Sequence, residues 1–98
     1  MISQVTIENT FKRLEAAAAA GERCPQSPPM GTLSSAAAGQ LARAGKIRIE
    51  IFMHNWRVVT IMEGPHAGKQ TQPPPAGKGG GKPYKIIYRD HIMMKRRA

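Results

Sequence analysis

Residues 46–61, KIRIEIFMHNWRVVTI, carry the strongest structural pattern in the chain. Isoleucines at positions 47, 49 and 51 alternate with Arg48, Glu50 and Phe52. Because successive side chains of a strand point to opposite faces, this period of two predicts a β-strand with one buried face. After the MHN interruption, residues 56–62 are rich in Val, Ile and Thr, which favour strands. The two runs together predict a β-hairpin.

Two registers are compatible with this hairpin. A three-residue loop over residues 53–55, with Asn55 left-handed, places Ile49 opposite Val59 and Ile47 opposite Ile61. Arg57 then shares the tip of that apolar face with Ile51. A two-residue turn at positions 54 and 55 would instead place Val58, Thr60 and Met62 beside the isoleucines. The sequence predicts the hairpin and leaves its register open.

The N-terminal segment has the pattern of an amphipathic helix. Ile7, Phe11, Leu14 and Ala18 follow a helical stripe, and charged residues occupy the other face. The alanine run at 16–20 favours helix, and Gly21 can adopt the left-handed conformation that often ends one. We expect a helix over residues 4–20.

A second helix is expected after a proline-rich turn. Three prolines at positions 25, 28 and 29 exclude a helix interior there. Thr32 then offers an N-cap, Leu33, Ala37 and Leu41 form an apolar line, and Gly45 is a natural stop. The pattern predicts a helix over residues 33–44.

Beyond Met62 the composition changes. Residues 63–83 combine Gly, Pro and Lys without periodicity, which is typical of a flexible, solvated linker that forms no core. Residues 84–88, YKIIY, again favour a strand, and RDHIMMKRRA ends in a basic tail. We therefore divide the chain into a small domain at 1–62, a linker at 63–83, and a short strand with a basic tail at 84–98.

Composition and charge limit the class of function. A chain of 98 residues with 41% hydrophobic content suits a single small core. Its 15 Lys and Arg against six Asp and Glu give a net charge of +9, which favours polyanionic partners. The single Cys24 allows no internal disulfide, no apolar run is long enough to cross a bilayer, and no signal peptide is recognisable. We expect a cytoplasmic protein without membrane contact.

Helix, proline-rich turn, helix and hairpin together predict a small α+β domain, because only the helices can cover the isoleucine face. The segment LARAGKIRIEIFMHNWRVVTI, residues 41–61, resembles the end of a recognition helix followed by the wing of a winged helix-turn-helix domain. The resemblance covers roughly residues 4–62 and rests on element order and hydrophobic pattern. The chain departs from the family between its helices, where the prolines at 25, 28 and 29 replace a full helix.

The resemblance implies duplex DNA binding by a small regulator or accessory factor. The helix at 33–44 would enter the major groove, cations around its end and on the wing would contact phosphates, and the wing tip would reach a minor groove. In this helix only Gln40 has a side chain able to read adenine bidentately, and no Arg lies in the first turns to read guanine, so mainly phosphate contact is expected. The expected DNA-binding residues are Thr32, Ser34, Ser35, Gln40, Arg43, Lys46, Arg48, His54, Asn55 and Arg57.

A second hypothesis is a protein-interaction module, in which the hairpin edge or the YKIIY strand pairs with another chain or with a second copy. The alanine-rich second helix, with its few base-reading side chains, favours this alternative. Trp56 is expected to pack across the hairpin beside Phe52 rather than to stack on a base.

Enzymatic activity is not expected. The segment GPHAGKQT, residues 64–71, resembles a phosphate-binding loop, but it has three residues between its glycines, and prolines follow where a helix should begin. His54, His66, His91 and Cys24 match no metal-ligand spacing, and no catalytic set of Ser, His and acid is recognisable. We therefore expect no cofactor, no metal and no small-molecule substrate.

Overall fold

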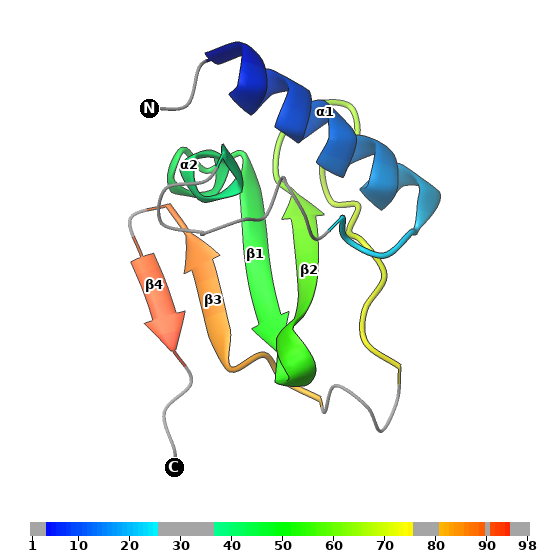
Figure 1. Ribbon diagram of the computed structural model, residues 1–98, viewed down its shortest axis with the longest axis vertical. Coiled ribbons are helices and arrows are strands. Elements are labelled where there is room, and N and C mark those ends of the chain that lie inside the picture. The colour runs from blue at the N-terminus through cyan, green and yellow to red at the C-terminus, as the bar shows by residue number, and fades with distance from the viewer. Residues whose placement is uncertain (1–3, 26–36, 76–80, 90, 95–98) are drawn as a thin grey trace.

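The computed structural model describes residues 4–25, 37–75, 81–89 and 91–94, which form an α+β domain (Figure 1). Its sheet is antiparallel, with the strand order β2-β1-β3-β4, and both helices contact it. The elements are α1 (Gln4–Ala20), α2 (Ala37–Arg43), β1 (Ile47–Phe52), the 3₁₀ turn η1 (Met53–Asn55), β2 (Trp56–Ile61), β3 (Lys85–Tyr88) and β4 (His91–Met94).

The hairpin of β1 and β2 has the register of the three-residue loop. Ile47 lies opposite Ile61, and Ile49 lies opposite Val59. His54 and Asn55 both have left-handed backbones, with φ of 61° and 58°. These two residues reverse the chain within η1, so the predicted left-handed Asn55 is confirmed and the two-residue turn is wrong.

The first helix is confirmed over the range expected for it. Leu14 and Ala18 are buried, Ile7 and Phe11 pack against the core, and Gly21 ends the helix with φ of 68°. α1 contacts α2 and β2, and in Figure 1 it lies above the start of β1 and the end of β2. The apolar stripe of α1 therefore covers the β2 half of the buried sheet face.

The second helix covers the other half of that face, with contacts to β1 and β3. Its expected start at residue 33 lies outside the described residues, and it ends at Arg43. Five of its seven described residues are buried: Ala37, Ala38, Gly39, Leu41 and Ala42. Because most of these side chains are small, the helix backbone can approach the strands closely.

The chain after β2 does not leave the domain, in contrast to the structureless linker expected from residue 63. Gln70 forms an antiparallel bridge with Thr60. Thr71 is fully buried; its hydroxyl accepts a hydrogen bond from the Val59 amide at 2.9 Å, and its own amide donates to the Val59 carbonyl at 3.0 Å. Left-handed glycines at 64 and 68 reverse the chain, and the returning segment satisfies the backbone groups at the outer edge of β2.

The predicted strand at YKIIY is present as β3, and it pairs with the edge of β1 that β2 leaves open. Ile87 lies opposite Ile49 and is 4% exposed, so it belongs to the core. The segment expected to be only a basic tail contributes β4, which pairs with β3. β1 is thus an inner strand with partners on both edges.

The turn between α2 and β1 gives a stability prediction. Gly45 has φ of 81°, and a Cβ at this position would lie 3.0 Å from the guanidinium carbon of Arg89. Gly45→Ala should lower the free energy of unfolding by about 1–2 kcal/mol, through backbone strain and displacement of that side chain. Chemical denaturation measures the change.

Gly81→Ala is the matched control, because Gly81 has an unstrained backbone and open space where a Cβ would stand. It should change the free energy of unfolding by less than about 0.5 kcal/mol. Equal effects of the two substitutions would contradict the assigned conformation of the α2–β1 turn.

Candidate nucleic-acid interface

The predicted recognition helix presents little described surface. Thr32, Ser34 and Ser35 lie outside the described residues. Within α2, Gln40 is half-buried and Arg43 is exposed, while the other five residues face the core. Base reading from the described part of α2 therefore depends on Gln40 alone, and Arg43 is placed at the helix end.

The two arginines expected on the wing lie on opposite faces of the sheet. Arg48 is opposite Thr60, on the face turned away from the core isoleucines. Arg57 is opposite Ile51, on the face that packs against the helices, and its Nε is buried without a hydrogen-bond partner among the described residues. A single flat ligand cannot contact both guanidinium groups through one face of the sheet.

The tip residues form a separate group. His54 and Asn55 are exposed in η1, and Lys46 lies at the other end of β1. Six strand residues span about 20 Å, so the tip is remote from the end of α2 (Figure 1). The structure thus separates the described predicted residues into a tip group and a group near the α2–β1 turn.

Arg89, which is far along the chain from α2, also belongs to the group near the α2–β1 turn. The Arg89 amide donates a 2.6 Å hydrogen bond to the Ala42 carbonyl in the last turn of α2. Its guanidinium lies beside Gly45 and 5.1 Å from the centre of the Tyr88 ring. Arg89 itself has a left-handed backbone, with φ of 57°, at the turn after β3.

Tyr88 lies on the same sheet face as Arg48. Ile49 pairs with Ile87, and one further step in this antiparallel register brings Tyr88 beside Arg48. Arg43, Lys46 and Arg89 therefore lie around the end of α2, and Arg48 and Tyr88 lie at the same end of the sheet, on the face turned away from α2. We call these five residues the basic patch.

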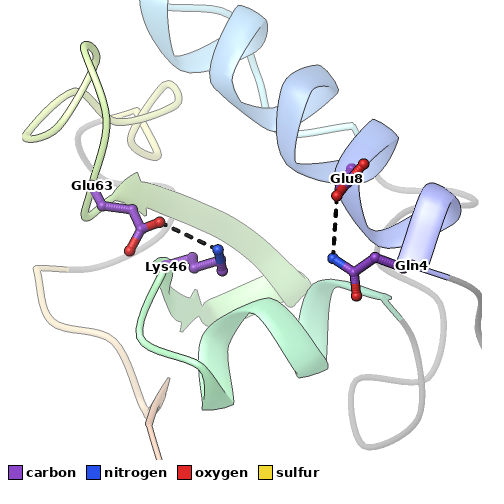
Figure 2. A network of polar contacts seen from close by, with 4 residues as sticks. All are labelled: Gln4, Glu8, Lys46 and Glu63. Atoms are coloured by element: carbon purple, nitrogen blue, oxygen red, sulfur yellow. Dashed lines mark hydrogen bonds and ion pairs between the residues drawn. The ribbon is translucent and has the colours of Figure 1, made fainter.

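Lys46 of the basic patch forms an ion pair with Glu63. Lys46 Nζ lies 3.3 Å from Glu63 Oε2, and the two side chains are 44% and 53% exposed (Figure 2). A pair this exposed contributes less than about 1 kcal/mol, because water screens it. Lys46 can therefore exchange Glu63 for a phosphate at small cost. The C-terminal carbonyls of α2 also favour nearby cations, which helps to hold the patch together without a ligand.

Trp56 has a structural role at the tip end of the hairpin. It lies opposite Phe52 in the register, as expected. Its indole Nε1 donates to the Gln72 carbonyl at 2.9 Å, and Arg23 lies 4.0 Å over its ring. The Gln72 amide in turn donates to the Glu22 carbonyl. Trp56 thus ties the segment after β2 to the segment after α1.

Two members of the basic patch, Tyr88 and Arg89, were not among the residues expected from sequence. The sequence indicates this part of the patch only by placing a cation, Arg89, directly after the YKIIY strand. Locating it beside α2 requires the pairing of β3 with β1, which brings residues some forty positions apart into contact.

Comparison of the chain with protein-family models, with curated proteins and with solved structures finds no match. Across the described ranges, no three His, Cys, Asp or Glu side chains gather in a way that could hold a metal ion. In the same part of the chain, neither helix is long and apolar enough to cross a bilayer.

Cys24 gives a pH prediction that reports on the core beneath the hairpin. The side chain is 2% exposed, and burial raises the pKa of its thiol from 9.0 to about 11, against the opposing charges of Arg57 and Arg23. The unfolded thiol ionises near pH 9 and the folded one near pH 11. Its contribution to stability is therefore complete below pH 9 and is lost as the pH rises towards 11.

The free energy of unfolding should accordingly fall more steeply above pH 9 in the natural chain than in Cys24→Ala. Denaturation of both proteins at a series of pH values separates this effect from the titration of Lys and Tyr, which both proteins share. A stability difference that stays constant from pH 8 to about 10.5 would contradict the buried, neutral thiol.

Proposed function

We propose that the chain is a small duplex-DNA-binding protein that contacts phosphates through the basic patch. The observation that carries the proposal is the position of Arg89, which a distant strand brings to the end of α2 beside Gly45. Cations from α2, the α2–β1 turn and the β3–β4 turn thereby lie at one end of the sheet, and Arg48 of β1 lies at the same end on the opposite face.

Arginine suits this role because its planar guanidinium can donate two hydrogen bonds to a phosphate. The Arg89 guanidinium lies over the ring of Tyr88, and this contact limits the motion of the arginine side chain. Lys46 adds a point charge that its exposed pair with Glu63 does not strongly restrain. These contacts neutralise backbone charge and carry little sequence information.

We also propose that α2 with the β1–β2 hairpin acts as a winged-helix unit. The direct passage from α2 through Gly45 into a two-stranded hairpin with an exposed tip supports this arrangement. A wing about 20 Å long lets His54 and Asn55 reach a neighbouring groove while the basic patch lies on phosphates. Arg57 makes no DNA contact in this arrangement, because its side chain lies on the helix-packed face.

Fluorescence anisotropy with a labelled duplex over a series of salt concentrations tests the proposal. With three or four phosphate contacts, the log–log slope of affinity against salt should be about −3 to −4. Arg89→Gln and Arg48→Gln should each lower affinity similarly on unrelated duplexes and reduce the size of the slope by about 0.9.

Arg13→Gln is the matched control, since Arg13 is an exposed arginine on α1. It removes the same charge and should leave the slope close to that of the natural chain. If all three substitutions reduce the slope equally, the binding is diffuse and the basic patch is not the site. Tighter binding to a single strand than to a duplex would contradict the proposed partner.

A further inference from the structure

A hollow lies on the α1 side of the domain, apart from the tip and the sheet face of Arg48. It has a volume of about 340 Å³ and an apolar floor that includes Ile7, Phe11 and Leu41. α1 forms one wall, and the turn at Glu63, Gly64 and Pro65 forms the other. On the same helix Val5 is 65% exposed, so apolar surface continues beyond the hollow.

The charges around this hollow differ from those of the rest of the chain. Three of the six acidic residues in a chain of net charge +9 line it, Glu8, Glu15 and Glu63. Two cations line it as well, Lys12 and the basic-patch residue Lys46. On α1 the exposed Glu8 and Lys12 lie one turn apart with opposite charges, and the half-buried Glu15 follows Lys12 on the same side of the helix. Gln4 donates to Glu8 at 3.4 Å, which keeps this carboxylate on the same face (Figure 2).

We infer that two copies of the chain pair through this face, with their α1 helices antiparallel across a two-fold axis. A two-fold interface brings residue i of one copy against residue j of the other, and j against i. If Glu8 of one copy meets Lys12 of the other, the second pair of the same kind follows by symmetry.

Charge complementarity is the reason for choosing a second copy as the occupant. Two chains of net charge +9 repel each other, so a contact is favoured where local charges of opposite sign can face each other. Glu8 and Lys12 on the exposed face of α1 provide such a pair. A helix of 17 residues is about 25 Å long and buries at most a small interface. The pair should therefore be weak, with dissociation in the micromolar range or above, and should strengthen as added salt screens the net repulsion.

Sedimentation equilibrium from about 10 µM to about 1 mM tests the inference without DNA, so its outcome does not depend on the proposed function. Glu8→Lys and Lys12→Glu should each weaken association about tenfold, because each places like charges opposite one another twice. The double variant Glu8→Lys/Lys12→Glu should restore it. The two single substitutions change net charge in opposite directions, so a general charge effect cannot weaken both.

Arg13→Glu is the control, because it makes the same charge change as Lys12→Glu at the next position of the helix, about 100° away. It should leave association within about twofold of the natural chain, and circular dichroism checks that every variant retains its helices. A monomer throughout the concentration range overturns the inference, and so does a double variant no better than the single ones.

Discussion

The burial of one face of β1 is the constraint on which the rest of the structure depends. Ile47, Ile49 and Ile51 are at most 4% exposed, and each buried isoleucine contributes about 1.5–3 kcal/mol relative to an exposed one. Ile49 has Val59 on one side and Ile87 on the other. A shift of one residue would turn all three isoleucines to the opposite face, so this face fixes the register of both neighbouring strands.

That register also decides which cations are available to a ligand. With the isoleucines turned towards the helices, Arg48 must lie on the other face, and the partner position of Ile51 turns Arg57 inward. The pairing of β3 with β1 then carries Tyr88 and Arg89 to the end of α2. The basic patch is thus a consequence of how the core is buried, since the strands that fill the core also set the positions of its charges.

Local pattern was sufficient to predict the features that depend on near neighbours in sequence. The bounds of α1, the stop at Gly45 and the hairpin follow from helical spacing, glycine conformation and strand alternation. The three-residue register already implied that Arg48 and Arg57 lie on opposite faces, although both were grouped as DNA contacts. The sequence did not reveal the return of Gln70 and Thr71 along β2, because glycine- and proline-rich composition resembles a linker even where the backbone is hydrogen-bonded. It also could not place Arg89, because nothing local specifies which edge of β1 the YKIIY strand will join.

Strand β3 belongs to the folded sheet and holds Arg89 at the end of α2. Amide hydrogen exchange of the natural chain tests this claim most directly, because the Arg89 amide donates to the Ala42 carbonyl and lies outside any regular strand. The account predicts that the amides of Ile87 and Arg89 are protected to an extent comparable with the inner strand β1. Exchange of both amides at the rate of an unstructured peptide, with β1 still protected, would contradict it.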